Sequence, residues 1–147
     1  MKFRIIILML VASLMSGCSL FESASQSLNY VTEATTYVKD VSTFAEKLPT
    51  LAQDTVTNSA ALDQITSSFT QMKQDITEFN QLDAPAFAQD VHDKLIQYNE
   101  TFLKEINTYI SDLSSGSINL ETIAQSEMMK TMNGITGLLN QVQQLGQ

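Results

Sequence analysis

The sequence has few of the residues on which protein chemistry most often depends. Its 147 residues include one cysteine, one histidine and no tryptophan, and acidic residues outnumber basic ones by 16 to 8. A single cysteine has no disulfide partner within the chain. The shortage of lysine and arginine argues against nucleic-acid binding, because contacts to phosphate depend on clusters of these residues. It equally disfavours electrostatic attachment to anionic lipid head groups.

Residues 1–17 have the layout of a lipoprotein signal peptide. Lys2 and Arg4 form a short positive region, and an apolar run follows at residues 5–12. This run is too short to span a membrane, which takes about 20 residues. Small residues come next, as they do before the cleavage site of a signal peptide. The sequence therefore predicts export, with cleavage between Gly17 and Cys18.

Cys18 is the candidate lipidation site. The stretch Met15-Ser16-Gly17-Cys18 resembles the bacterial lipobox, in which the cysteine sulfur receives a diacylglycerol. The usual leucine three residues before the cysteine is replaced by Met15. The rival interpretations are an ordinary signal-peptide residue or a free thiol, which suits an oxidising compartment poorly. Because two acyl chains give stable attachment, we expect the diacylglycerol on Cys18 to hold the protein at the cell membrane.

Four later segments carry apolar residues at helical spacing, at 28–48, 62–79, 87–113 and 120–145. The second has the clearest stripe, with spacings of three and four through Leu62, Ile65, Phe69, Met72, Ile76 and Phe79. No segment alternates convincingly as a strand does. The sequence therefore predicts an all-α, antiparallel three- or four-helix bundle over residues 28–147, preceded by a lipidated N-terminus and short tether at residues 18–27.

Local signals suggest where these helices end. Pro49 is expected to end the first helix or to lie just past it, since proline disfavours helix in the residue before it. Asp83 is expected to cap the third helix, with Pro85 in its first turn. Gly134 and Gly137 interrupt the fourth segment, and a split near residues 125–126 stays open.

The third helix has the widest apolar face. Adjacent apolar pairs repeat along it every seven residues, at Leu95/Ile96, Phe102/Leu103 and Tyr109/Ile110. Adjacent residues of a helix point about 100° apart, so doubling the row widens the face. We therefore expect this helix to lie at the centre of the bundle.

No group of residues has the pattern of a catalytic or metal site. His92 has no ligand-type residue three or four positions away, and we expect it to be solvated or to cap a helix. The pairs Asp75/Glu78 and Asp90/Asp93 lack the glycine turn and ligand rhythm of a calcium loop. A solvated acidic face is the expected role of these carboxylates.

The methionines and the paired glycines have structural explanations. Met128, Met129 and Met132 form a cluster that could bind copper(I), but adaptable packing in the core is the preferred interpretation. The stretch Gly134-Ile135-Thr136-Gly137 is expected to serve close helix packing or a kink. We expect no catalytic residues, no metal and no cofactor, and hence no enzyme.

Three stretches carry a family resemblance. They are LMSGCSLFE from residue 14, SLNYVTEATTYV from residue 27 and EFNQLDAPAFAQDVHDKLIQYNE from residue 78. They resemble the YjhA-like small lipoproteins of bacilli, a group of unknown function, over nearly the whole chain. The resemblance implies a helical domain at a Gram-positive cell surface and brings no known activity. Only Cys18 carries over as a functional residue.

Two functional hypotheses follow. The first is a lipid-anchored, extracytoplasmic interaction or accessory module for an unidentified envelope protein. The second is a carrier of a small ligand or metal, with an apolar pocket between helices lined by methionine and tyrosine.

Overall fold

The computed structural model describes residues 17–54, 59–115 and 126–145, and nearly all of them are helical. Three long helices, α2 (Gly17–Asp54), α3 (Ser59–Asn80) and α4 (Gln89–Ser115), are followed by the shorter α5 (Glu127–Thr136) and α6 (Leu139–Gln144). A single 3-10 turn, η1 (Ala86–Ala88), precedes α4. No strand occurs among the described residues. The predicted all-α class is confirmed.

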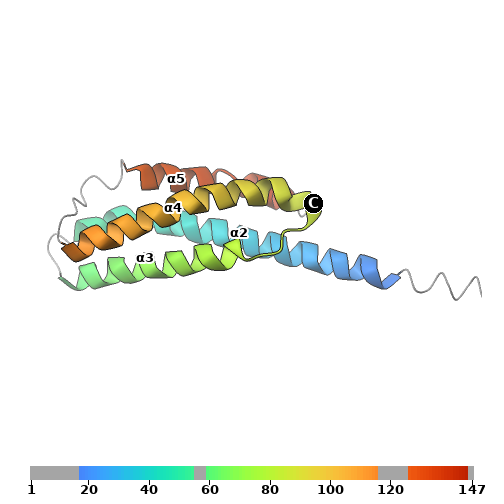
Figure 1. Ribbon diagram of the computed structural model, residues 1–147, viewed down its shortest axis with the longest axis horizontal. Helices are drawn as coiled ribbons and strands as arrows, with labels where there is room; N and C mark the ends of the chain where they lie inside the picture. Colours follow the sequence, from blue (N-terminus) through green and yellow to red (C-terminus); the bar gives the residue numbers. More distant parts are fainter. Residues whose placement is uncertain (1–16, 55–58, 116–125, 146–147) are drawn as a thin grey trace, which may run out of the picture.

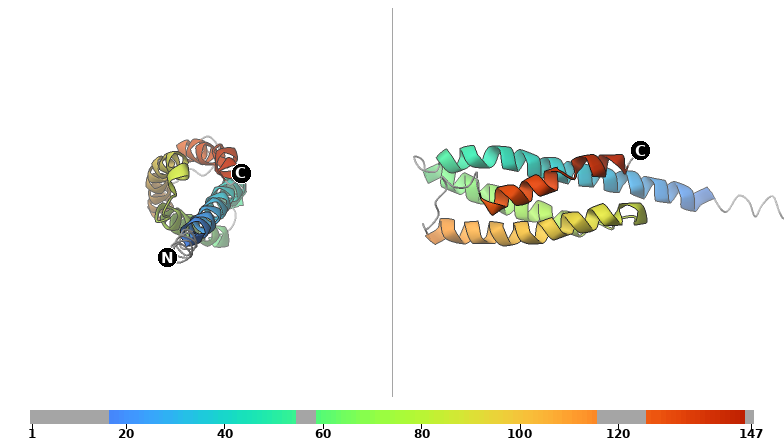
Figure 2. Two further views of the ribbon diagram at one scale, coloured as in Figure 1. Left: turned by 90° about the vertical axis from the view of Figure 1, so that its right-hand side faces the viewer. Right: turned by 90° about the horizontal axis from the view of Figure 1, so that it is seen from above.

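The helices form an antiparallel four-helix bundle in which α5 and α6 together make the fourth helix (Figure 1). Helix α2 packs against α3 on one side and against α5 and α6 on the other, while α4 packs between α3 and α5. Seen end on, the helices therefore form a ring with α2 and α4 on opposite corners (Figure 2). The expectation that α4 lies at the centre of the bundle is wrong. Its wide apolar face packs against α3, α5 and the shared core, and no ring of the described helices surrounds it.

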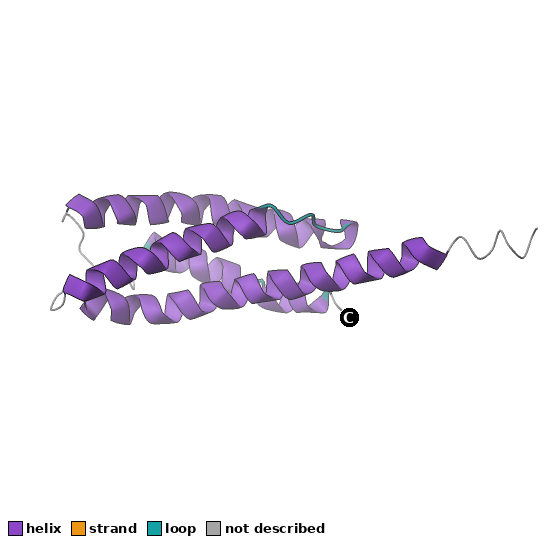
Figure 3. Ribbon diagram, turned by 90° about the horizontal axis from the view of Figure 1, so that it is seen from below, coloured by secondary structure: helices purple, strands orange, loops and turns teal. Residues whose placement is uncertain are grey.

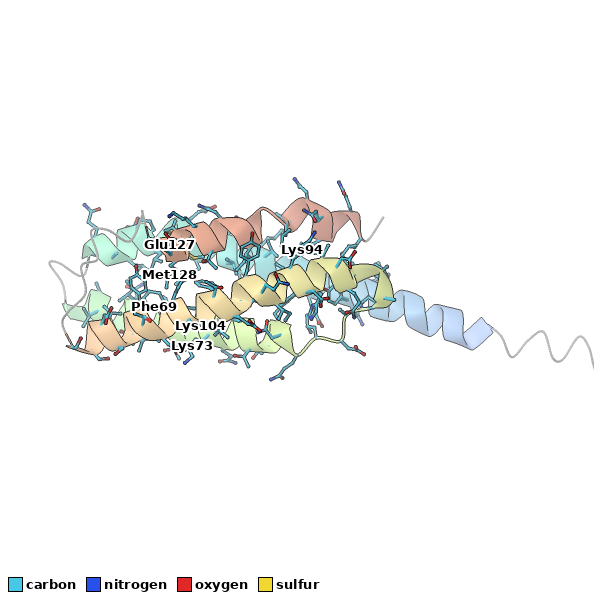
Figure 4. The ribbon with its side chains drawn as sticks, turned by 45° about the horizontal axis from the view of Figure 1, so that its top comes forward. Phe69, Lys73, Lys94, Lys104, Glu127 and Met128 are labelled. Atoms are coloured by element: carbon cyan, nitrogen blue, oxygen red, sulfur yellow. The ribbon has the colours of Figure 1, made fainter. Side chains whose placement is uncertain are left out.

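The buried core residues are largely those of the predicted apolar stripes, with a few exchanged for a neighbouring residue. Five of the six stripe residues of α3 are buried, but Leu62 is 38% exposed and Ala61 is buried beside it. Phe69 and Met128 point into the bundle from α3 and α5, whereas Lys94 and Lys104 extend from the outside of α4 (Figure 4). Burial of large side chains such as Phe69 contributes roughly 1.5–3 kcal/mol each, which makes this core the main source of stability.

Helix α2 is longer than its apolar pattern predicts. It begins at Gly17, so residues 18–27, where the sequence suggested either a tether, the preferred interpretation, or a frayed helix start, are its first turns. Its N-terminal part extends past the ends of the other helices (Figure 3). A helix rises 1.5 Å per residue, so Tyr30 lies about 18 Å along the axis from Cys18. The bundle is thus joined to Cys18 through continuous helix.

Pro49 lies inside α2 rather than at its end. A proline in a helix removes one hydrogen bond and clashes with the carbonyl four residues earlier. Leu48 and Ala52 are almost fully buried on either side of it. Their burial keeps the chain helical through the proline, so the expected helix end at this residue is wrong.

The connections around α4 and α5 also differ from expectation. Asp83 does not cap the next helix, because Pro85 takes the N-cap position of η1 and no side chain caps that turn. Ser126 is the N-cap of α5, and its hydroxyl accepts a hydrogen bond from the Met129 amide. The helix of this segment then breaks at Gly137. The residues on which an earlier part of this helix was expected, 116–125, lie outside the described structure.

Candidate functional site

A row of side-chain contacts crosses the core between the two diagonal helices. Tyr30, Tyr37 and Phe44 lie one heptad apart on α2 and face α4. The Tyr30 hydroxyl lies 3.1 Å from His92 Nδ1, and the Phe44 and Phe102 ring centroids are 6.2 Å apart. Parallel helices with the same heptad spacing keep the same partners in register. The row therefore fixes the position of α4 along α2.

Asn99 is the centre of the polar part of this row. It is fully buried, its Oδ1 accepts a hydrogen bond from the Tyr37 hydroxyl, and its Nδ2 donates to Asn80 Oδ1 over 2.7 Å. One amide thus ties together α2, α3 and α4. Burial raises the pKa of Tyr37 far above its usual value, so this hydroxyl stays protonated as a donor. Burial also raises the pKa of Tyr30, to about 12, with Asp93 adding to the shift.

His92 is buried, not solvated. It is 8% exposed, and its ring packs edge-on against Tyr30 at 5.7 Å between centroids. Burial lowers its pKa, and the Asp93 carboxylate partly opposes that effect. The expectation of a solvated or capping histidine is therefore wrong. His92 and Asn99 are spaced like Tyr30 and Tyr37, and this shared heptad was the sequence signal that would have placed both in the core.

A groove runs along the surface between α2 and α3. Its larger part has a volume of about 430 Å³, and a second part of about 230 Å³ continues it toward the α3–α4 connection. Both parts are lined by Glu33 and Leu82, so the two are contiguous. Its apolar floor includes Tyr37 and Phe79, whose rings stack with centroids 4.4 Å apart.

The groove is strongly acidic. Five carboxylates line its two parts: Glu33 and Asp40 from α2, Asp75 and Glu78 from α3, and Asp83 from the connection. No lysine lines either part. Burial raises the pKa of Asp40, and the Asp75 carboxylate on the facing helix raises it further. The two helices therefore present negative charge toward the same space.

The two predicted carboxylate pairs behave differently. Asp90 and Asp93 are exposed on α4, in agreement with a solvated face. Asp75 and Glu78 instead line the groove, and each accepts a hydrogen bond over 2.8 Å from a glutamine of its own helix, Gln71 and Gln74 respectively. The sequence pattern of α3 alone could not show that carboxylates of α2 face them.

The methionine cluster and Gly134 have structural roles. Met128 and Met132 are fully buried in the core, as the packing interpretation predicted. A Cβ atom on Gly134 would lie 2.4 Å from the ring of Tyr98, so glycine allows α4 and α5 to approach closely at this point. The close-packing interpretation of Gly134 is confirmed. Neither groove part is lined by methionine, so they are not the methionine–tyrosine pocket that the carrier hypothesis predicted.

Glu105 is a partly buried acid on the other side of the bundle. Its Oε2 atom is buried without a hydrogen-bond partner. Burial raises the pKa of Glu105, the nearby Thr131 hydroxyl lowers it, and the Glu127 carboxylate raises it. Thr131 donates its hydroxyl proton to the Glu127 carbonyl over 3.1 Å, which leaves little donor capacity for Glu105. This acid therefore weakens the bundle when it is ionised.

Cys18, the predicted lipidation site, and Gly17, the predicted cleavage position, lie in the first turn of α2. Among the described residues, no helix is both long and apolar enough to cross a membrane. The same part of the chain contains no cluster of three or more histidine, cysteine or acidic side chains arranged to hold a metal ion.

A family model matches residues 30–145, which include the whole row of core contacts and every residue that lines the groove except Asn29. The chain belongs to the Family of unknown function (DUF6376). The uncharacterized lipoprotein YybP of Bacillus subtilis (strain 168) is 29% identical over 131 residues, covering 89% of this chain and 88% of that protein. No solved structure matches. Membership of DUF6376 brings no activity with it, so function must be argued from this chain.

Proposed function

We propose that this DUF6376 protein is a lipid-anchored, extracytoplasmic module that binds another protein of the cell envelope. The observation that carries the proposal is the position of Cys18 in the first turn of a helix that continues into the bundle. A diacylglycerol on this residue would join the membrane to the bundle through about 18 Å of helix before Tyr30. The bundle would then stand at a defined distance from the outer face of the cell membrane.

The lipoprotein relative supports the anchoring part of this proposal, because its match covers most of both chains. We retain the narrower resemblance to YjhA-like lipoproteins, and with it a Gram-positive cell surface, as part of the same proposal. The module acts by contact and not as an enzyme. Its buried histidine and tyrosines support that role, since His92 and Tyr37 are engaged in holding helices together.

Crosslinking in intact cells tests the proposal. The mature protein is treated with a membrane-impermeant crosslinker, and adducts are identified by mass spectrometry beside those of a Cys18→Ala variant. The expected result is one envelope protein that recurs with the anchored form and is depleted in the variant. Repeated recovery of no specific partner would contradict the interaction role.

A further inference from the structure

We propose that the groove between α2 and α3 is the docking site for a lysine- or arginine-bearing segment of the partner protein. This inference rests on the proposed function, which supplies a partner at the same membrane face. It names the surface that the partner contacts and the chemistry that the partner presents.

The shape of the groove suits a peptide segment rather than a single small cation. Its lining on α2 extends from Asn29 to Asp40, which corresponds to about 17 Å along a helix axis. Leu82 supplies partly exposed apolar surface in the groove, and the stacked rings of Tyr37 and Phe79, which are almost fully buried, close the floor beneath it. Lysine and arginine side chains suit such a surface, because their aliphatic stems pack on apolar groups while their charged ends stay at the rim.

The floor of the groove is held in place from beneath. The Tyr37 hydroxyl points into the core and donates to Asn99, so the almost fully buried ring is fixed in place beneath the groove. Tyr30 lines the second part of the groove and is held in the same way by His92. A surface that is already ordered loses little side-chain entropy when a partner binds.

The negative charge of the groove favours a positively charged partner segment. Within the described structure, none of its five carboxylates forms an ion pair with a lysine. Lys73, which lies on α3, is directed to the opposite side of that helix, where it donates to Asn107 of α4 over 2.7 Å. Complementary charge across an interface favours a basic partner and suppresses others.

The same charge excludes two other occupants. A second copy of this chain carries the same net charge of −8, and its own groove is equally acidic. An anionic lipid surface is repelled by the same carboxylates. A basic segment of a protein in the same membrane remains, and the groove begins about 17 Å along α2 from Cys18, within reach of sequences close to the membrane.

Peptide binding to the mature lipoprotein in zwitterionic micelles tests the inference. The probe is a fluorescent amphipathic peptide of about 12 residues, long enough as a helix to fill the groove, that carries lysine and leucine. Its counterpart carries glutamate in place of lysine. The groove variant combines four neutral substitutions: Glu33→Gln, Asp40→Asn, Asp75→Asn and Glu78→Gln. The control variant removes the same number of charges elsewhere: Glu46→Gln, Asp63→Asn, Glu100→Gln and Asp112→Asn.

We expect the lysine peptide to bind the wild type and the control variant, and to bind the groove variant at least about tenfold more weakly. Added salt should weaken binding, and the glutamate peptide should not bind. Equal affinity of the two variants, or no binding to the wild type, would overturn the inference. Equally strong competition by spermidine would also overturn it, because the groove would then be a site for small cations.

Crosslinking in cells separates failure of the groove from failure of the proposed function. A photo-crosslinking amino acid replaces Thr36, which lines the groove, or Thr101, an exposed threonine on the diagonal helix α4. An adduct from position 36 whose crosslinked partner peptide contains lysine or arginine supports the inference. An adduct from position 101 alone would contradict the groove as the docking site. It would still support the proposed interaction role, with the partner bound to another face. No adduct from either position would contradict both proposals.

Discussion

At the scale of single residues, the structure shows how buried polar side chains can join three helices in one core. Asn99, Tyr37 and Asn80 satisfy one another across three helices. A buried polar group costs stability only when its hydrogen bonds are missing. These residues therefore help to specify the register of the helices.

Asn99→Ala should destabilise the bundle by about 3 kcal/mol, because the truncation leaves both the Tyr37 hydroxyl and the Asn80 amide without their buried partner. Urea denaturation followed by circular dichroism measures this change. Adding Tyr37→Phe removes one of the two polar groups that Asn99→Ala leaves without a partner. The double variant should therefore lose less stability than the sum of the losses in Asn99→Ala and Tyr37→Phe. Strict additivity of the two substitutions would contradict the proposed hydrogen-bonded unit.

Glu105 gives the bundle a pH dependence of known sign. Its pKa in the folded protein is raised above the ordinary 4.5, so the folded state holds this proton more tightly than the unfolded state does. The stabilising contribution of the protonated form is complete below pH 4.5 and is lost as the pH rises through the folded-state pKa.

Glu105→Gln should therefore stabilise the protein near neutral pH, by about 0.5 kcal/mol for this partly exposed group. The gain should disappear below pH 4.5, where the native carboxyl is itself neutral in both states. Denaturation midpoints measured across this pH range check the prediction, with the exposed Glu100→Gln as control. A gain that is independent of pH would show that charge at residue 105 is not its cause.

At the scale of helices, periodicity predicted most of what the structure contains, and non-local packing decided the rest. The stripe of α3 placed Ile65, Phe69 and Ile76 correctly because a helix with one buried face needs only its own spacing. The burial of His92 depends on the register between α2 and α4, which lie far apart in the sequence. The groove likewise needs the carboxylates of two helices, so neither was visible in one segment alone.

Pro49 shows the same competition between local preference and packing. Proline inside a helix costs about 3 kcal/mol relative to alanine in an isolated helix, yet burial of Leu48 and Ala52 keeps α2 helical. Pro49→Ala restores the missing hydrogen bond but also frees the unfolded chain, so we expect a net gain of roughly 1 kcal/mol.

Chemical denaturation of the purified protein measures this gain, with the exposed neighbour Thr50→Ala as the control. The control should change stability by less than about 0.5 kcal/mol. A loss of stability in Pro49→Ala would mean that the core requires proline at this position, contrary to this interpretation.

At the scale of the whole molecule, the features fall into an order along α2. Cys18 is in its first turn, the acidic groove lies beside the part of α2 from Asn29 to Asp40, and the core contacts with α4 run beneath that groove. The proposed anchor and the proposed docking site are thus parts of one helix. The lipobox-like stretch at Cys18, together with the shortage of lysine and arginine, predicted that a lipid rather than the protein surface holds the molecule at the membrane.

Metabolic labelling of Cys18→Ala with a fatty acid tests the anchor on which this account depends. We expect the wild type to incorporate the label and to migrate as the cleaved, membrane-associated form. The variant should remain unlabelled and largely uncleaved, because it lacks the sulfur that receives the lipid. Normal processing and undiminished fatty-acid labelling of Cys18→Ala would contradict the lipid anchor, and with it the proposed place of the bundle at the cell surface.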